Sequence, residues 1–353
     1  MKILLVKLSS LGDVVHTLPV VQDILAALPE AQIDWVIEEA FAPLLTQVSG
    51  LRRIIPCALR RWRNSLLTPQ TRTDWRAFRF DLQQDSYDAV IDLQGLTKSA
   101  VVARLAMLTP DGKRYAMANQ TTGSGYEAPT RWLADVAIPL ESNLHAVARG
   151  RLLAAAALGY STGVSNQVNY GLNMPLAHIN RAQSAPEIIA KVKVDSIVFI
   201  HGTSRQDKCW PLQSWVELGQ LMMASGYQIT LVHGSAAELV TSQTIAAQLA
   251  GSTVLPLLAL GALAKEMNAC AGAIGVDSGV SHIAVALGLP LVQIYNFDTA
   301  WRTGPLSCAH QLSVFGQPVP TVDAVWQAWC ECVKEGAKER AKELVKVLES
   351  RAP

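Results

Sequence analysis

The feature that most constrains the fold is a repeated pattern of short apolar runs, each followed by a turn and a helical segment. The first instance has an apolar run at 3–6 (ILLV), a turn of small residues at Ser9–Gly12, and apolar residues at helical spacing from Val14 to Leu25. Two more strand-like runs follow at 33–37 (IDWVI) and 89–93 (AVIDL). Continuously apolar strands that alternate with helices are typical of a parallel sheet covered on both faces. We therefore predict an α/β fold with a doubly wound parallel sheet.

The same plan starts again in the second half of the chain. From about Ser161 to Pro186 the pattern weakens into polar, Asn- and Pro-containing sequence, which predicts a linker. Strand-like runs then resume at 196–200 (SIVFI), 228–232 (QITLV), 273–276 (AIGV) and 291–295 (LVQIY). A length of 353 residues suits two cores. We predict two facing Rossmann-like domains, 1–170 and 186–325, and a C-terminal helix in 326–353 that either crosses back to the first domain or caps the second.

Charge and hydropathy narrow the classes of function. The 30 Lys and Arg residues nearly balance 29 Asp and Glu residues, so we expect no nucleic-acid partner bound through bulk charge. Mean hydropathy is high at +0.21, yet no stretch reaches the ~18 uninterrupted apolar residues of a membrane span. The N-terminus also lacks the apolar region of a signal peptide. We expect a cytoplasmic protein whose contact with a membrane is peripheral.

Ligands of doubly wound sheets bind at the carboxyl ends of strands, beside helix N-termini. In the first half of the chain this rule selects the turn Ser9–Asp13, where small residues such as Ser10 and Gly12 let a ligand approach the backbone. Asp13 is the one ionisable group of that turn. It is either a plain helix cap or a general base that accepts a proton from a hydroxyl nucleophile.

Two turns of the second half suit an anion. Residues 202–208 (GTSRQDK) place hydroxyls and a cation after a strand, which fits a phosphate, although a polar loop with a solvated Lys208 is equally compatible. Residues 275–282 (GVDSGVSH) end a strand and open a helix with Ser281 and His282. We expect Asp277 to orient Lys208 or to accept a ligand hydroxyl. His282 belongs either to the site or to an ordinary helix start.

An arginine-rich segment forms a further candidate. Between residues 52 and 79 the chain has a single acid, Asp74, and eight arginines: 52, 53, 60, 61, 63, 72, 76 and 79. A run of like charge is usually a solvated helix face. Arginine without lysine favours bidentate recognition of carboxylates or phosphates. Because the net charge is near zero, we expect this cluster to bind a discrete anionic ligand.

Two absent motifs exclude common nucleotide chemistries. The chain has no D-x-D triplet, the carboxylate pair that commonly holds a divalent metal on a sugar nucleotide. No G-x-G-x-x-G fingerprint follows the first strand, which argues against a nicotinamide dinucleotide enzyme.

Six segments together form a more specific pattern than any single turn. They are K-L-S-S-L-G-D-V-V-H-T-L-P (7–19), D-W-V-I-E-E (34–39), R-R-W-R (60–63), Y-D-A-V-I-D-L-Q-G-L-x-K-S (87–99), T-S-R-Q-D-K-x-W-P (203–211) and V-D-S-G-V-S-H (276–282). In this order they resemble the lipopolysaccharide heptosyltransferases, and within that family the heptosyltransferase I group.

The resemblance implies a GT-B glycosyltransferase that transfers L-glycero-D-manno-heptose from ADP-heptose to the inner Kdo of Kdo2-lipid A. It implies inversion at the anomeric carbon, no metal or other cofactor, and work on the inner face of the inner membrane. Asp13 matches the family's base. The implied donor-binding residues are Thr203, Ser204, Lys208, Glu238, Leu258, Asp277, Ser278, Gly279 and His282. The expected acceptor-binding residues are Ser10, Gly12, Arg60, Arg61 and Arg63.

The chain departs from the family pattern at three places. Residues 296–299 (NFDT) stand where the family often has G-P-T-D, and Asn64 replaces a basic residue. The stretch Thr121 to Trp132 differs from the arginine-containing helix expected before the acceptor site. Two alternatives therefore stay open: a later-acting heptosyltransferase of the same family, and a two-domain protein that binds a sugar nucleotide without catalysing a reaction.

Overall fold

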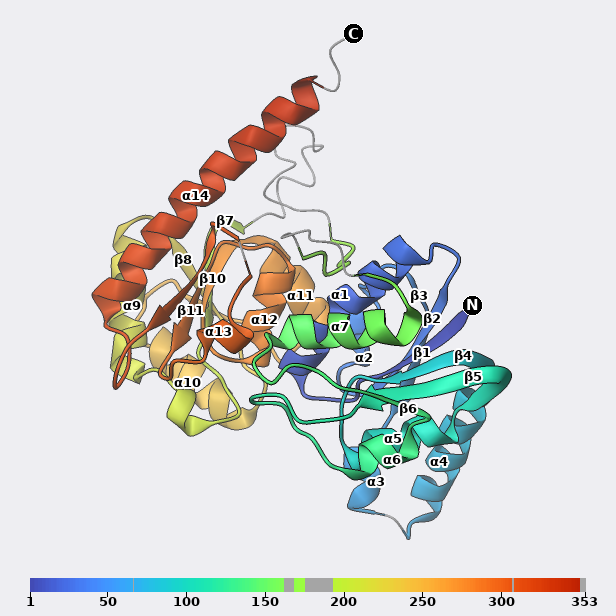
Figure 1. Cartoon of the computed structure of the whole chain (residues 1–353). Helices are drawn as coiled ribbons and strands as arrows, with labels where there is room; N and C mark the ends of the chain where they lie inside the picture. The colour runs from blue at the N-terminus through green and yellow to red at the C-terminus, as the bar shows by residue number, and fades with distance from the viewer. Residues whose placement is uncertain (66, 162–167, 175–192, 307, 350–353) are drawn as a thin grey trace. The chain divides into compact units, whose positions relative to one another are not determined.

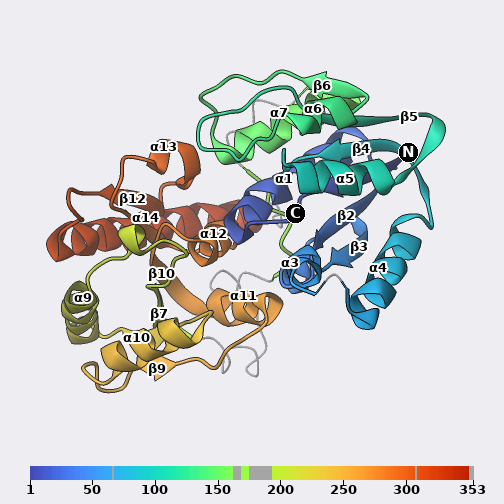
Figure 2. The same cartoon turned by 90° about the horizontal axis from the view of Figure 1, so that it is seen from below.

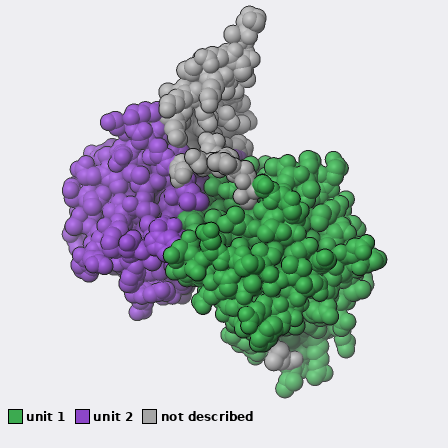
Figure 3. Space-filling view, viewed as in Figure 1, with its two compact units in different colours: residues 1–173 green, residues 174–353 purple. Residues whose placement is uncertain are grey.

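A computed structural model describes residues 1–65, 67–161, 168–174, 193–306 and 308–349. The chain divides into two compact units, Met1–Asn173 and Met174–Pro353, each with its own sheet (Figures 1 and 3). Most of the predicted linker, from about Ser161 to Pro186, lies outside the described residues.

The first unit is built on a six-stranded parallel sheet in the order β3-β2-β1-β4-β5-β6. The strands are β1 (Lys2–Val6), β2 (Gln32–Glu38), β3 (Leu51–Cys57), β4 (Ser86–Asp92), β5 (Met107–Met117) and β6 (Val136–Ile138). The apolar runs predicted at 3–6, 33–37 and 89–93 are confirmed as β1, β2 and β4. All three are almost entirely buried, as continuously apolar strands in the middle of a parallel sheet should be.

Helices cover both faces of this sheet (Figures 1 and 2). They are α1 (Leu11–Ala27), α2 (Ala42–Leu45), α3 (Leu59–Arg63), α4 (Pro69–Leu82), α5 (Thr97–Leu105), α6 (Pro129–Leu133) and α7 (Ala146–Leu158). Trp62 of α3, Phe78 of α4 and Val102 of α5 pack with Leu4 and Val6 of β1 in one core. Helices α1 and α7 pack along each other on the other side of the sheet.

The second unit repeats the arrangement with the order β12-β11-β10-β7-β8-β9, again all parallel. Its strands are β7 (Lys193–Ile200), β8 (Gln228–Leu231), β9 (Thr253–Val254), β10 (Cys270–Val276), β11 (Leu291–Tyr295) and β12 (Gln311–Phe315). Its helices are the short 3-10 helix η2 (Gln206–Lys208), α9 (Leu212–Ala224), α10 (Ala236–Ala246), α11 (Leu260–Asn268), α12 (Gly279–Ala286), α13 (Ala300–Thr303) and α14 (Val322–Glu349).

The two sheets have the same strand order when each is numbered from its own first strand. In both units the first strand lies between the second and the fourth, so strand order reverses between β1 and β4 and between β7 and β10. The predicted α/β class and doubly wound plan are therefore confirmed. The carboxyl ends of these four strands mark the place where such sheets bind ligands.

The C-terminal helix α14 begins at Val322, four residues before the predicted boundary at 326. Its first turns pack against α9, β11 and β12 of the second unit, where Val325, Trp329 and Cys332 are buried. This part of the helix therefore belongs to the core of the second unit. Whether the end of the helix reaches the first domain stays a prediction.

The structure corrects the expectation that the whole arginine cluster faces a ligand. Arg52 donates two hydrogen bonds to Asp34, from Nε at 2.8 Å and from Nη2 at 2.5 Å. Arg53 forms ion pairs with Asp81 and Asp85. Bidentate recognition of a carboxylate was the right chemistry for Arg52, but its partner is the buried Asp34 on β2 of the same chain. The ion pairs of these two arginines stabilise the edge strand β3.

We predict that Gly272→Ala destabilises the second unit. A Cβ at Gly272, in the central strand β10, would lie 2.5 Å from Trp329 Cη2 and 2.6 Å from the carbonyl oxygen of Pro290. Overpacking of this kind costs about 1–3 kcal/mol, so we expect the unfolding temperature to fall by about 3 to 8 °C. The matched control is Gly336→Ala in α14, where the nearest atom would lie at 3.5 Å. An equal loss in both variants in thermal unfolding would contradict the prediction.

Candidate active site

Two groups of predicted residues lie at the two places where strand order reverses. In the first unit the residues Lys7–Ser10 connect β1 to α1, which begins at Leu11. We call Lys7–Asp13, the connection with the first residues of the helix, the Asp13 turn. In the second unit Lys208, Asp277 and His282 lie in the turns after β7 and β10, and we call them the Lys208 cluster. Each group is built by its own unit.

The Asp13 turn is fixed by the neighbouring turn that follows β4. The side-chain oxygen Oε1 of Gln94 accepts the N–H groups of Leu8 and Ser9, both at 3.0 Å. The Lys98 ammonium donates to the hydroxyl of Ser9 at 3.2 Å. These contacts span the reversal between β1 and β4, so the second turn holds the first in position.

Asp13 occupies the third position of α1 and binds back to the residue before the helix. Its Oδ2 accepts the N–H of Ser10 at 3.2 Å and the Ser10 hydroxyl at 2.8 Å. The other oxygen, Oδ1, lies 3.6 Å from Nη2 of Arg149 in α7. The capping contact that the sequence left open is therefore present. It occupies one carboxylate oxygen, and a role of Asp13 as base stays a prediction.

Two cations determine the ionisation of Asp13. Burial alone would raise the pKa of this carboxyl, but Lys7, the Ser10 hydroxyl and Arg149 together hold the pKa below its usual range. Lys7 is itself buried, which lowers the pKa of its ammonium, and it donates to the carbonyl oxygen of Leu93 at 3.0 Å. Asp13 is thus a carboxylate throughout the neutral pH range.

Sequence reasoning missed Arg149, which lies in the apolar helix α7. Arg149 is 7% exposed and contacts the hydroxyl of Thr121 at 3.3 Å as well as Asp13. The stretch Thr121 to Trp132, which departs from the family pattern, contains the short helix α6 with Arg131. The contact of Arg149 with Asp13 joins α7 to α1, so no local motif connects the two residues.

The Lys208 cluster joins the two turns at the reversal in the second unit. The Lys208 ammonium lies 2.5 Å from Asp277 Oδ2, and His282 Nε2 lies 3.5 Å from Asp277 Oδ1. The hydroxyl of Thr203 donates to the backbone carbonyl of Asp277 at 3.3 Å. Asp277 thus contacts Lys208, and its alternative role as acceptor of a ligand hydroxyl stays a prediction.

Asp277 is 6% exposed, yet its carboxyl stays ionised. Burial alone would raise its pKa, but the adjoining His282 and Lys208 outweigh that effect and hold the pKa well below the usual range. One of the three N–H donors of Lys208 serves Asp277, and a lysine ammonium has two more to offer a ligand.

Helix α12 opens beside this cluster with unused N–H groups. Ser278 caps the helix, since its hydroxyl accepts the N–H of Ser281 at 3.4 Å and its carbonyl accepts the N–H of His282 at 3.2 Å. The N–H groups of Gly279 and Val280 lie ahead of these bonds, where a helix has no internal acceptors. The helix therefore begins at Gly279, two residues before the start expected from sequence.

Glu238 lies in the first turn of α10 and reaches back to the end of β7. Its Oε2 accepts the N–H of Gly234 at 2.7 Å, and its own N–H donates to the Ser235 hydroxyl. The carboxyl group lies against the backbone of Gly202, where a Cβ would come 2.5 Å from Glu238 Cδ. Gly202 is thus required for this contact because it has no side chain.

Two other predicted donor positions lie in neighbouring turns. Ser204 is exposed in the turn after β7. Leu258 is half-buried between β9 and α11, two strands away from β7 in the sheet.

Asn296, which follows β11, holds the turn that carries Lys208. Its Nδ2 donates to the carbonyl oxygens of Asp207 at 3.0 Å and Cys209 at 2.9 Å, the residues on either side of Lys208. Sequence reasoning noted residue 296 only as a departure from the family pattern. The partners lie almost ninety positions away in sequence, so no local motif connects them.

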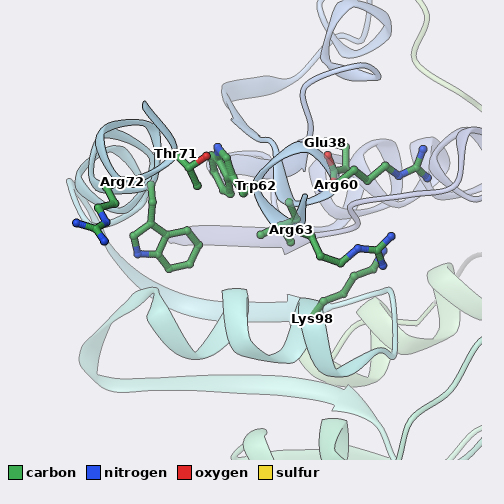
Figure 4. A pocket seen from close by; sticks show the side chains of 9 residues that line it. Glu38, Arg60, Trp62, Arg63, Thr71, Arg72 and Lys98 are labelled. Carbon is green, nitrogen blue, oxygen red and sulfur yellow. The ribbon is translucent and has the colours of Figure 1, made fainter. Parts of the chain in front are cut away.

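The arginines of α3 lie beside a cavity of about 570 Å³ in the first unit (Figure 4). Its lining residues are Glu38, Leu59, Arg60, Trp62, Arg63, Thr71, Arg72, Trp75 and Lys98. Figure 4 shows how Arg60, Arg63 and Lys98 are arranged around it. Arg61 has another environment, because its guanidinium forms ion pairs with Glu39 and Asp74. Two of the three predicted arginines thus line the cavity.

The described residues contain neither a metal-binding cluster nor a membrane-spanning helix. Among those residues, no group of three or more His, Cys, Asp or Glu side chains is placed to hold a metal ion. Within the same part of the chain, no helix combines the length and the apolar character needed to cross a membrane.

Comparison with known families identifies the chain. Residues 75–323 match the family model of glycosyltransferase family 9 (heptosyltransferase), which is well over half of the sequence. The chain belongs to glycosyltransferase family 9. As a member of this family of heptosyltransferases, it is a glycosyltransferase.

Relatives with known names agree with this membership. Lipopolysaccharide heptosyltransferase 1 of Pseudomonas aeruginosa is 38% identical over 310 residues, which cover 86% of this chain and 81% of the relative. The enzyme of the same name from Escherichia coli K12 is 36% identical, over 84% of this chain and 88% of its own. Lipopolysaccharide heptosyltransferase 2 of the same organism is 24% identical, over 87% and 86%.

Solved structures of a heptosyltransferase have the same fold as this chain. The structure of E. coli heptosyltransferase WaaC with ADP superposes with a TM-score of 0.81 and 33% identity, covering 94% of this chain and all of that one. WaaC with ADP-2-deoxy-2-fluoro heptose gives a TM-score of 0.75 over 93% of this chain and 98% of the other.

We predict that Asp92→Asn stabilises the protein at neutral pH and not in acid. Asp92 is fully buried at the end of β4, and burial raises the pKa of its carboxyl to about 6. Between its ordinary pKa of about 3.9 and about 6, the folded state retains a proton that the unfolded chain has lost. The folded protein is therefore most stable, relative to the unfolded chain, in acid, where Asp92 is protonated in both states. This contribution to stability is lost as pH rises through 6. Asparagine resembles the protonated form and keeps an oxygen for the N–H groups of Gln94 and Gly95.

The measurement is the unfolding temperature of both proteins at about pH 4 and about pH 7.5. We expect the variant to gain over the wild type only at the higher pH. A loss of similar size at both pH values would contradict the prediction, since it would mean that Ser99 requires the ionised oxygen Oδ2 as its acceptor.

Proposed function

We propose that this enzyme transfers L-glycero-D-manno-heptose from ADP-heptose to the inner Kdo of Kdo2-lipid A, with inversion and without a metal. The observation that carries the proposal is the Lys208 cluster at the N-terminus of α12, which fits a sugar diphosphate. Names of the relatives support the reaction, because identity to the heptosyltransferase 1 enzymes of Pseudomonas aeruginosa and Escherichia coli K12 is 38% and 36%, and to heptosyltransferase 2 of E. coli only 24%. The ADP and ADP-heptose analogue bound to WaaC support the donor.

The Lys208 cluster would bind the diphosphate of the donor. Two free N–H donors of Lys208 and the helix N–H groups of Gly279 and Val280 favour negative charge at this point. The hydroxyls of Ser204 and Ser278 add donors, the hydroxyl of Thr203 holds its turn through the carbonyl of Asp277, and His282 strengthens the cluster from α12. As the bond from the sugar to the diphosphate breaks, negative charge grows on the departing ADP. These groups stabilise it without rearrangement, because Asp277 has already fixed Lys208.

The remaining donor positions suit the nucleoside. Glu238 Oε2 accepts the N–H of Gly234, so its other oxygen can accept a hydrogen bond from a hydroxyl of the sugar nucleotide. Leu258 offers a half-buried apolar side chain against the nucleotide.

Asp13 would act as the general base. The acceptor hydroxyl oxygen attacks the anomeric carbon from the face opposite ADP, so one C–O bond forms as the other breaks and the configuration inverts. The hydroxyl proton moves to the carboxylate of Asp13. Lys7 and Arg149 keep this carboxylate ionised but weakly basic, so the proton is transferred late, once bond formation has made the attacking oxygen acidic.

The acceptor side would use the cavity beside α3. Arg60, Arg63 and Lys98 present cations that suit the carboxylates and phosphates of Kdo2-lipid A. Ser10 and Gly12 leave the backbone beside Asp13 open to the acceptor sugar. Arg61 forms ion pairs with Glu39 and Asp74, and its expected role in binding the acceptor stays a prediction. Because the acceptor is a lipid, the enzyme would work peripherally at the cytoplasmic face of the inner membrane.

Two substitutions should separate catalysis from donor binding. We expect Asp13→Ala to lower kcat by about 10² to 10⁴-fold, the usual value of a general base, while ADP affinity stays within a few-fold. Lys208→Ala should weaken ADP binding by about 10- to 100-fold and reduce transfer with it. Calorimetric titration with ADP and a transfer assay with ADP-heptose and Kdo2-lipid A measure the two quantities.

The chain offers matched controls for both variants. Asp23 lies on the same helix as Asp13 and pairs with Arg151 of α7, as Asp13 does with Arg149, so Asp23→Ala should retain transfer. Lys265 is an exposed lysine of the second unit, and Lys265→Ala should retain ADP affinity.

Full transfer by Asp13→Ala would remove Asp13 from the mechanism. Turnover only with an acceptor that already carries heptose would identify a later-acting enzyme instead, and loss of turnover with a chelator would contradict metal independence.

We predict a third effect at Asn296, which positions Lys208 without contacting substrate. Asn296→Ala removes two hydrogen bonds that hold the lysine turn, so ADP affinity should fall by about tenfold. The control is Asn119→Ala in the first unit, which removes Nδ2 hydrogen bonds to the carbonyls of Gln120 and Leu140. Both variants should lose thermal stability, and only the first should bind ADP more weakly. An equal ADP affinity in the two variants would refute the positioning role.

A further inference from the structure

One side of α4 carries charge and apolar surface that the proposed mechanism does not use. Arg72, Arg76 and Arg79 are exposed at spacings of four and three residues, so they form one stripe along the helix. Phe80 continues this stripe and is 73% exposed, and Leu67, just before the helix, is 84% exposed. We call these five residues the α4 face. We propose that the α4 face docks on the anionic surface of a lipid membrane, an inference that rests on the proposed lipid acceptor.

The charges of α4 are sorted between its two sides. Its two acids are Asp74 and Asp81, and both are bound by arginines of other elements, Arg61 and Arg53. Phe78 and Leu82 are buried in the core of the first unit. With its acids engaged elsewhere, the helix presents its positive charge outward. The positive side therefore complements an anionic surface.

The position of the helix suits a flat partner. Helix α4 packs against β3, which is the edge strand of the sheet, and it lies at the rim of the first unit in Figures 1 and 2. A helix at a rim presents its outer side without neighbouring elements of that sheet beyond it. Large exposed apolar side chains beside basic ones are the composition of helices that lie in a membrane interface.

Charge and apolar exposure together favour a lipid surface over a nucleic acid. Each basic residue near an anionic leaflet strengthens binding by about fivefold, and burial of an exposed phenylalanine or leucine strengthens it further. A nucleic acid would reward the arginines but leave Phe80 and Leu67 in water. The inner side of the same helix contributes Thr71 and Trp75 to the cavity assigned to the acceptor. Docking through the α4 face would bring that cavity next to the leaflet that holds the acceptor.

Binding to vesicles tests the proposal directly. The full chain is sedimented with vesicles of mixed phosphatidylglycerol and phosphatidylcholine, and with vesicles of phosphatidylcholine alone. We expect binding to the anionic vesicles and a loss of about 20-fold in affinity for the double variant Arg76→Gln/Arg79→Gln. Phe80→Ala should reduce binding several-fold. Arg72 is left unchanged because it also lines the cavity.

A second double variant controls for total charge. Arg104 of α5 and Arg131 of α6 are exposed in the same unit, and Arg104→Gln/Arg131→Gln removes the same charge away from α4. This variant should bind the anionic vesicles within about twofold of the wild type. Wild-type protein that ignores anionic vesicles, or equal losses in both double variants, would overturn the proposal. Wild-type affinity in Arg76→Gln/Arg79→Gln would do the same.

A transfer assay keeps this test separate from the proposed function. Arg76→Gln/Arg79→Gln should transfer heptose normally to a water-soluble Kdo disaccharide acceptor without acyl chains, and slowly to Kdo2-lipid A embedded in the anionic vesicles. Equal rates for the variant and the wild type on both acceptors would overturn the docking role of the α4 face. If the wild type transfers heptose to neither acceptor, the proposed reaction is refuted, whatever the result of the vesicle-binding experiment.

Discussion

The whole arrangement depends on the reversal of strand order in a parallel sheet. In each unit the first strand has a neighbour on both sides, and the crossovers after the first and fourth strands leave in different directions. The turns that follow these strands therefore face a shared opening. In the first unit Gln94 connects the two turns through Leu8 and Ser9, and in the second Lys208 connects them through Asp277. The reversal of strand order thus positions both candidate sites, the Asp13 turn and the Lys208 cluster.

The two candidate sites use opposite charge arrangements. In the first unit two cations, Lys7 and Arg149, stabilise a single carboxylate, which is the base of the proposed mechanism. In the second unit a buried carboxylate, Asp277, holds Lys208, the cation proposed to bind a phosphate. Buried ions of this kind are stable only when their partners are in place, because an unpaired charge in the interior is very costly. Each group is consequently preorganised by its partner before any substrate arrives.

Local sequence pattern predicted the central strands and the turns, and it failed where long-range pairing decides the structure. β1, β2, β4 and β11 each contain a mostly apolar, buried run that stands out in the sequence. β3 was missed because Arg52, Arg53 and Pro56 interrupt its apolar character, and it is a strand only because it pairs with β2. β9 has two residues and is too short for any periodicity. Its existence depends on its pairing with β8.

The same limit applies to the site. The motifs singled out the turns that carry Asp13, Lys208 and Asp277, because small residues after apolar runs are a local signal. Partners from distant segments, such as Arg149 for Asp13 and Asn296 for the lysine turn, left no such signal. The contact between Gly202 and Glu238 is of this kind too, and it has an evolutionary consequence. A side chain at 202 would push the Glu238 carboxyl off the backbone, so that carboxyl keeps its present position only as long as a glycine is retained at 202.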